Sequence, residues 1–158
     1  MKAPQSVRDA LALLSAPDLN GFAPIHHAAV NGNTELVALL GAVFACVRSP
    51  VVDVRDRRGM TALQWAIQRG QGAVIAKLVE VGASLTRQDA QGRDALHHAI
   101  IAAARANASD RSFYYNMVRF LLQAGADVTQ KDSQGATALH MASGSGDVEM
   151  VLVFLLHL

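Results

Sequence analysis

Histidines are the residues best suited to chemistry in this 158-residue chain, and five of the six fall at matched places. His26 and His97 each begin an adjacent pair, with His27 and His98, and His140 stands alone. Neighbouring residues of a helix point about 100° apart, so one pair cannot direct both rings at a single ion. Zinc needs three or four ligands around one point. The histidines therefore favour a structural role, and we expect no metal or other cofactor.

Other catalytic signatures are missing from the sequence. It contains no phosphate-binding Gly-x-x-x-x-Gly-Lys-Ser/Thr loop, no His-Glu-x-x-His and no Gly-x-Ser-x-Gly. The nearest glycine-rich stretch, 143–146, falls where a helix is expected to end. Cys46 is the single cysteine, and its apolar sequence neighbours indicate an unreactive thiol. We therefore expect no enzyme and no small-molecule substrate.

Composition narrows the classes of partner. A formal net charge of +1 gives no field strong enough to favour nucleic acid or an acidic membrane surface. The longest apolar run, 150–156, is too short to span a bilayer, so a membrane is expected only if the full-length protein continues into one. One cysteine allows no intramolecular disulfide, and the first residues do not resemble a signal peptide. We expect a soluble protein in the cytoplasm or elsewhere inside the cell.

The elements that position the histidines recur along the chain. Four segments share an aspartate, a glycine three residues later, a stretch that opens a helix, and an alanine; they begin at Asp18, Asp56, Asp89 and Asp132. The glycines are spaced 38, 33 and 43 residues apart. Asp-x-x-Gly is turn chemistry, because the carboxylate accepts nearby backbone N–H groups and the glycine takes positive φ.

A helix-turn-helix unit follows each turn. Thr61 and Thr137 can cap free N–H groups at a helix start, and Pro24 suits a first turn. A second, apolar-striped helix ends at Gly82 or Gly125, where a left-handed cap is expected. Each unit then has apolar faces on both sides and must stack to bury them.

The repeated Asp-x-x-Gly-x-Thr-Pro-Leu-His-x-Ala pattern, with Gly-Ala endings at 82–83 and 125–126, resembles the ankyrin repeat over residues 18–158. The resemblance implies an all-α solenoid of helix-turn-helix units joined by β-hairpin-like finger loops. It also implies that His26, His97 and His140 bond the backbone of a neighbouring turn. We expect one array over 1–158: a capping helix at 1–17, repeat 1 at 18–55, repeat 2 at 56–88, repeat 3 with an insertion at 89–131, and repeat 4, incomplete in pattern, at 132–158.

Two repeats depart from the 33-residue unit. The first is five residues longer and the third ten longer. In the third, we expect the first helix to run on through 102–106 and the second to begin at Phe113, which adds roughly 7 Å to each helix. The added length fits either a tolerated insertion or a functional protrusion. The last helix ends apolar, which fits either a longer protein or self-association.

The resemblance implies that a partner binds the finger tips and the inner face of the first helices. The positions that correspond are Asn20, Phe22, Asn31, Arg57, Arg58, Met60, Trp65, Gln68, Arg69, Gln91, Arg93 and His98. Arginine and tryptophan are common at interface hot spots, and arginine pairs well with carboxylates. The alternatives are solvated arginines, a Trp65 packed in the core and a buried His98.

We therefore hypothesise a protein-interaction module that holds an acidic segment across repeats 1 to 3. A second hypothesis makes the array an intramolecular regulatory or targeting arm of a larger enzyme or membrane protein.

Overall fold

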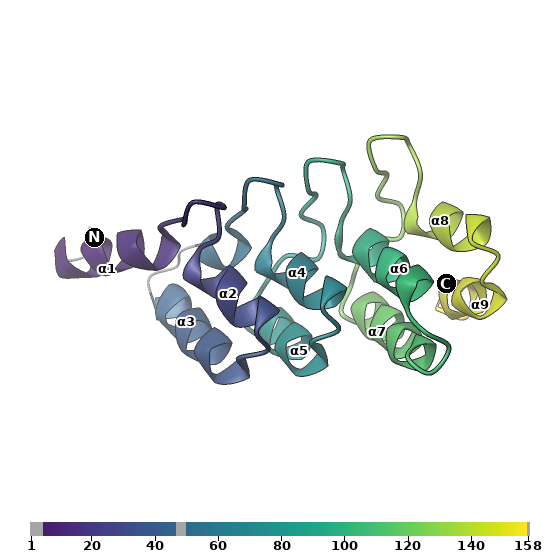
Figure 1. The fold of residues 1–158 in the computed structure, drawn as a ribbon, viewed down its shortest axis with the longest axis horizontal. Helices are drawn as coiled ribbons and strands as arrows, with labels where there is room; N and C mark the ends of the chain where they lie inside the picture. The colour runs from purple at the N-terminus through teal and green to yellow at the C-terminus, as the bar shows by residue number, and fades with distance from the viewer. Residues whose placement is uncertain (1–4, 47–49, 158) are drawn as a thin grey trace. The chain divides into compact units, whose positions relative to one another are not determined.

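The computed structural model describes residues 5–46 and 50–157, and the chain divides into two compact units, Met1–Ser84 and Leu85–Leu158. Unit 1 contains the helices α1 (Gln5–Ser15), α2 (Pro24–Val30), α3 (Thr34–Cys46), α4 (Ala62–Gln68) and α5 (Gly72–Glu80), with a short 3₁₀ turn at Pro50–Asp53. Unit 2 contains α6 (Ala95–Arg105), α7 (Arg111–Gln123), α8 (Ala138–Gly144) and α9 (Val148–Leu155). The ankyrin-like, all-α fold is confirmed (Figure 1).

Unit 1 is built from two helix hairpins, α2–α3 and α4–α5. The first helices of the hairpins pack on each other, as do the second helices. Ile25, Leu63 and Ile67 are fully buried, and small Ala29 and Ala66 allow close approach. This alternation of small and large apolar side chains is what the sequence pattern requires of a stacked unit.

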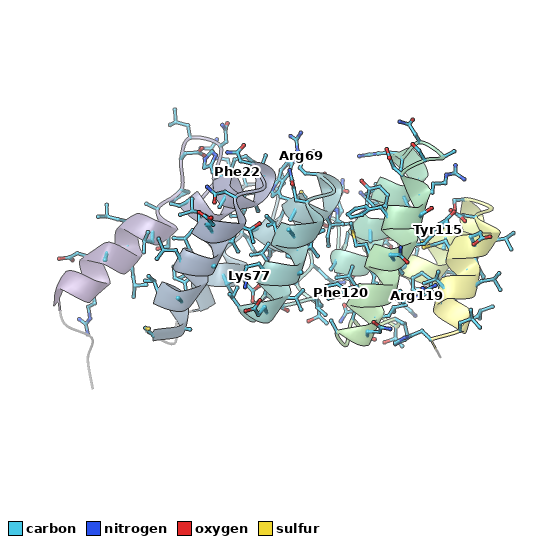
Figure 2. The ribbon with its side chains drawn as sticks, turned by 90° about the horizontal axis from the view of Figure 1, so that it is seen from below. Phe22, Arg69, Lys77, Tyr115, Arg119 and Phe120 are labelled. Carbon is cyan, nitrogen blue, oxygen red and sulfur yellow. The ribbon has the colours of Figure 1, made fainter. Side chains whose placement is uncertain are left out.

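Unit 2 repeats the arrangement with α6–α7 and α8–α9. Leu96, Leu121 and Phe154 fill its core, and α8 packs on α6 while α9 packs on α7. The Tyr115 hydroxyl donates a hydrogen bond to the Asp147 carboxylate at 3.0 Å, which ties α7 to the start of α9; Figure 2 shows Tyr115 directed from its helix toward α9.

The lengthened third repeat is present as predicted. α6 has 11 residues against 7 in α4, and α7 has 13 against 9 in α5, so each gains about 6 Å at 1.5 Å per residue. The predicted start of α7 at Phe113 is wrong by two residues. A hydrogen-bonded turn at Asn107–Asp110, in which the Asp110 amide donates to the Asn107 carbonyl at 3.0 Å, comes directly before the helix. The helix therefore begins at the next residue, Arg111.

In each finger loop the amide of the opening aspartate donates to the carbonyl four residues later, and the aspartate carbonyl accepts the amide of the turn glycine. The Asp56 amide donates to the Met60 carbonyl at 3.0 Å, and the Asp89 amide donates to the Arg93 carbonyl at 2.9 Å. Gly82 and Gly125 have φ of 90° and 93°, which confirms the left-handed ends predicted for the second helices. Within the described residues, no helix combines the length and apolar character that crossing a membrane requires.

Candidate partner-binding surface

The aspartate that opens each finger uses its two carboxylate oxygens differently. In the second finger, Asp56 Oδ1 accepts the Arg58 and Met60 amides, both at 2.8 Å. Its other oxygen, Oδ2, accepts the indole N–H of Trp65 at 2.8 Å, nine residues along the chain. The turn-forming role predicted for this aspartate is confirmed, and the same side chain also fixes the orientation of the Trp65 ring.

The second bond recurs at the same spacing in two other repeats. His27 Nε2 lies 3.0 Å from Asp18 Oδ2, and His98 Nε2 lies 3.0 Å from Asp89 Oδ2. Sequence reasoning missed this pairing, although an aspartate followed nine residues later by a ring N–H donor appears in three repeats. The fourth repeat has Met141 at that position, which offers no N–H.

An aromatic cluster lies beside the second finger in unit 1. The rings of Phe22 and Trp65 meet edge to face, with centroids 5.3 Å apart and planes at 86°. Phe22 also stacks on the buried His26 at 5.6 Å and meets the His27 ring at 5.4 Å. The Arg58 guanidinium lies 5.9 Å from the Trp65 ring centroid, within the range of a cation–π contact.

Phe22, Arg57, Arg58 and Trp65 together form what we term the unit 1 finger surface. Trp65 is half-buried: its ring packs on Phe22 and still reaches solvent, and its contact with a partner stays a prediction. Arg57 and Arg58 are exposed, and within the described ranges neither makes an ion pair. The adjacent carboxylate of Asp56 is buried and bonded to its own finger. The charge presented to a partner here is therefore positive.

The two fingers of unit 1 touch at their tips. A Cβ placed on Gly21, which has φ of +84°, would lie 2.7 Å from the Arg57 backbone nitrogen. Only glycine fits this contact, because a side chain would be both strained and in collision with backbone. The backbone that carries Arg57 and Arg58 is thus braced against the first finger.

The other predicted unit 1 residues lie on the same hairpins. Asn31 and Arg69 occupy equivalent positions, directly after α2 and α4, and both are exposed; Asn20 is exposed in the first finger and Gln68 is half-buried. Figure 2 places Phe22 and Arg69 along the same side of unit 1, with Lys77 of α5 lower in the view. That these residues contact a partner stays a prediction.

Two predicted contact residues are wrong as surface positions. Met60 is 3% exposed, because its amide is bound to Asp56 and its side chain enters the core. His98 is 2% exposed and its ring bonds to Asp89; burial lowers the pKa of His98 despite that carboxylate. For His98 the buried alternative holds.

The unit 2 candidates take a different place. Gln91 is exposed, and its carbonyl accepts the Ser133 amide at 3.0 Å, so it belongs to the contact between the third and fourth fingers. Arg93 is half-buried. The prediction that Arg93 lies near the arginines of unit 1 joins two units that are described separately, and it stays a prediction.

The structural role of the first-helix histidines is confirmed at two positions. His26 Nε2 bonds the Met60 carbonyl at 3.1 Å, and His97 Nε2 bonds the Ala136 carbonyl at 3.0 Å. The exposed His140 instead bonds Thr137 within its own repeat. Among the described residues, no group of three or more His, Cys, Asp or Glu could hold a metal ion. Cys46 is exposed rather than enclosed by its apolar sequence neighbours.

These stacked hairpins with braced fingers define a repeat protein of the interaction-module class. The family described as ankyrin repeats in three copies matches residues 5–89, 42–132 and 86–157, and the chain belongs to the ankyrin repeat family. Such repeats mediate protein–protein interaction and are not themselves catalytic.

The similar curated proteins are much longer than this chain. It is 34% identical over 82 residues to the palmitoyltransferase AKR1 of Saccharomyces cerevisiae, covering 51% of this chain and 10% of that protein. It is 38% identical over 80 residues to the probable E3 ubiquitin-protein ligase XBOS32 of Oryza sativa subsp. japonica, covering 49% of this chain and 15% of that protein.

Proposed function

We propose that this chain binds an acidic protein segment on the unit 1 finger surface. The observation that carries the proposal is the exposed Arg57–Arg58 pair beside a Trp65 ring whose orientation is fixed by Asp56. A fixed aromatic side chain loses little conformational entropy on binding, and arginine recognises carboxylates through paired hydrogen bonds. We therefore expect Asp or Glu of the partner to meet the arginines while an apolar partner side chain packs near Phe22 and Trp65.

The test begins with a library of displayed random peptides, from which those that bind the full chain are selected. We expect the selected peptides to be enriched in Asp and Glu, with an apolar residue nearby. Arg57→Glu/Arg58→Glu should weaken their binding at least tenfold, because two attractive contacts become repulsive. Added salt should weaken wild-type binding as well, since exposed charges are screened.

The matched control reverses two exposed arginines of unit 2, Arg105→Glu/Arg119→Glu. This variant has the same net charge as the first, so it separates a local contact from a general field. Unchanged peptide affinity in Arg57→Glu/Arg58→Glu, with unfolding like that of the wild type, would contradict the proposal. Arg93→Glu added to the first variant then tests whether the surface extends into unit 2.

A second candidate function is a regulatory or targeting arm within a larger protein. The observation that favours it is that both matched relatives are longer proteins, one named as a palmitoyltransferase and the other as a probable ubiquitin ligase. The array itself would remain non-catalytic and intracellular. If the gene encodes further domains, adding them as separate polypeptides should displace the selected peptides; failure to displace them would favour an external partner.

A further inference from the structure

His97 is a buried imidazole with an oxygen facing each ring nitrogen. Nδ1 lies 2.7 Å from Asp94 Oδ1, and Nε2 lies 3.0 Å from the Ala136 carbonyl oxygen. The side chains of His97 and Asp94 are both 1% exposed. Asp94 occupies the position that precedes α6, where Thr61 and Thr137 cap the equivalent helices.

The hydrogen-bond partners of His97 indicate how many hydrogens its ring carries. A carbonyl oxygen and a carboxylate oxygen only accept hydrogen bonds, and a neutral imidazole has one N–H. Nδ1 also lies 3.4 Å from the Asp94 backbone amide nitrogen, a long contact that needs a ring nitrogen without hydrogen. The much shorter contact to Asp94 Oδ1 and the contact to Ala136 are satisfied together when both ring nitrogens carry hydrogen. A buried carboxylate also needs an opposite charge, and Asp94 Oδ2 is buried with no hydrogen-bond partner among the described residues. The geometry fits a His97 that carries hydrogen on both ring nitrogens, one directed at Asp94 Oδ1 and one at the Ala136 carbonyl.

The charges around His97 act in the same sense. Burial alone would lower the pKa of His97, but the Asp94 hydrogen bond, the Ala136 carbonyl and the nearby Asp132 carboxylate together raise it. The neighbouring pair of His98 and Asp89 is bonded within itself, and burial lowers the pKa of His98. The extra proton therefore resides on His97.

The Ala136 carbonyl belongs to the fourth finger, which we define as residues 131–137. Among the described residues, the bonds that hold this finger to the third repeat inside unit 2 include three. The Ser133 amide donates to the Gln91 carbonyl at 3.0 Å, Gln88 Nε2 donates to the Lys131 carbonyl at 2.8 Å, and His97 donates to Ala136. Of these three bonds, the last alone depends on a titratable group.

We propose that protonated His97 fixes the fourth finger to α6 and that deprotonation releases the finger, which makes its mobility pH-dependent. After the proton leaves, one N–H remains for two acceptors. That hydrogen stays on Nδ1, because the carboxylate is the stronger acceptor, and Nε2 then faces the Ala136 carbonyl without one. Neutral His26 differs, because its Nδ1 accepts the Ala23 amide and its hydrogen stays on Nε2. Arg93 and Asp132 lie close enough to interact electrostatically, so a second acidic and a second basic group tune the transition. The proposal is independent of the partner assigned to unit 1.

The experiment combines two readouts on the whole chain between pH 5 and pH 9. Nitrogen-15 shifts of the histidine rings give the protonation state and the pKa of each ring. Hydrogen exchange of the Ser133 and Ala136 amides, divided by the intrinsic rate at each pH, gives the opening of the finger. We expect His97 to titrate above 6.5 and protection to fall about tenfold through that pKa, the equivalent of losing one charge-assisted hydrogen bond.

Asp94→Thr is the matched variant, because it installs the cap used before α8, where Thr137 Oγ1 lies 2.7 Å from His140 Nδ1. Its His97 should be neutral, and the pH dependence of finger protection should vanish. His26, in the same repeat position with Ala23 before it, serves as the internal neutral control.

Two outcomes overturn the proposal. One is a His97 that titrates below 6.5 in the wild type, a result that does not require the variant to fold. The other is protection of Ser133 and Ala136 with the same pH profile in wild type and Asp94→Thr.

Discussion

His26 in unit 1 and His97 in unit 2 occupy the same position of the repeat and carry different charges. Both rings are buried, and both bond a carbonyl of the following finger through Nε2. They differ at Nδ1. In His26 this nitrogen accepts the Ala23 amide at 3.0 Å, which requires a neutral ring. In His97 the equivalent amide, that of Asp94, lies farther away at 3.4 Å, and the Asp94 carboxylate is nearer at 2.7 Å.

The residue before the helix therefore decides the charge three positions later. Alanine leaves the backbone N–H as the Nδ1 partner, and aspartate supplies a carboxylate. The second repeat shows a third solution, in which Gln64 Oε1 accepts the Thr61 amide at 2.9 Å and no charge is involved. The fourth repeat adds the pair of Thr137 and His140. One fold position thus tolerates four different pairs, because in each the backbone amide before the helix bonds the side chain three residues later.

The largest expected effect comes from deleting each ring. His97→Ala leaves the buried Asp94 charge without its partner and should cost about 3–5 kcal/mol of unfolding free energy. His26→Ala leaves only neutral groups unsatisfied and should cost about 1–3 kcal/mol. Urea unfolding of both variants gives the comparison, since the cavity is the same size in each.

The double variant Asp94→Ala/His97→Ala provides the check on this interpretation. Removing both charges should cost no more than removing His97 alone, because the uncompensated carboxylate is gone. A double variant clearly less stable than His97→Ala would show that the pair is not held by charge.

The third and fourth fingers, both in unit 2, can be compared through their glycines. Gly92 has φ of +73°, and a Cβ there would lie 2.6 Å from the Ser133 amide nitrogen, whereas a Cβ on Gly135 would meet nothing within 4 Å. Gly135→Ala should cost about 1–2 kcal/mol for its left-handed backbone. Gly92→Ala should cost about 1–3 kcal/mol more, since the fourth finger must move. Equal unfolding midpoints would contradict the close finger contact.

The opposite charges predict opposite pH dependences. Burial lowers the pKa of His26 despite its bond to Met60, so its contribution is complete above pH 6.5 and is lost as pH falls through the lowered value. The pKa of His97 is raised, so its contribution is complete below pH 6.5 and is lost as pH rises through the raised value. For one proton, the unfolding free energy changes by at most about 1.4 kcal/mol per pH unit in either case.

Replacing each of these pairs by the Thr–Gln pair of the second repeat isolates the pH dependence of stability that His26 and His97 each contribute. We expect Ala23→Thr/His26→Gln to approach the wild type in stability as pH falls, and Asp94→Thr/His97→Gln to approach it as pH rises. Urea midpoints between pH 5 and pH 9 test this, and stability gaps that change in the same direction would refute the assignment of charge.

Much of the fold follows from spacing, because the turn glycines and threonine caps have local causes. The longer α6 and α7 were predictable for this reason, and the two backbone-bonding histidines were predictable from the resemblance to the ankyrin repeat. The start of α7 was not, since the turn at 107–110 competes with the helix pattern. The burial of Met60 was missed, and that of His98 was only one of two alternatives, because a position on an inner face does not show what covers it. The charge of His97 was missed because its cause is a substitution at the cap, three residues away.

The smallest expected effect concerns the aspartate–ring bond that the fourth repeat lacks. Asp18, Asp56 and Asp89 each bond a ring N–H nine residues later, whereas Met141 leaves Asp132 without such a donor. Met141→His should place a ring nitrogen where His98 has one and stabilise unit 2 by about 0.5–1.5 kcal/mol. Met141→Leu is the control, because it keeps an apolar side chain of similar volume. If both variants unfold at the same urea concentration, the aspartate–ring bond adds no stability. In the other repeats it then only fixes the direction of the ring, and its main consequence is the orientation of Trp65.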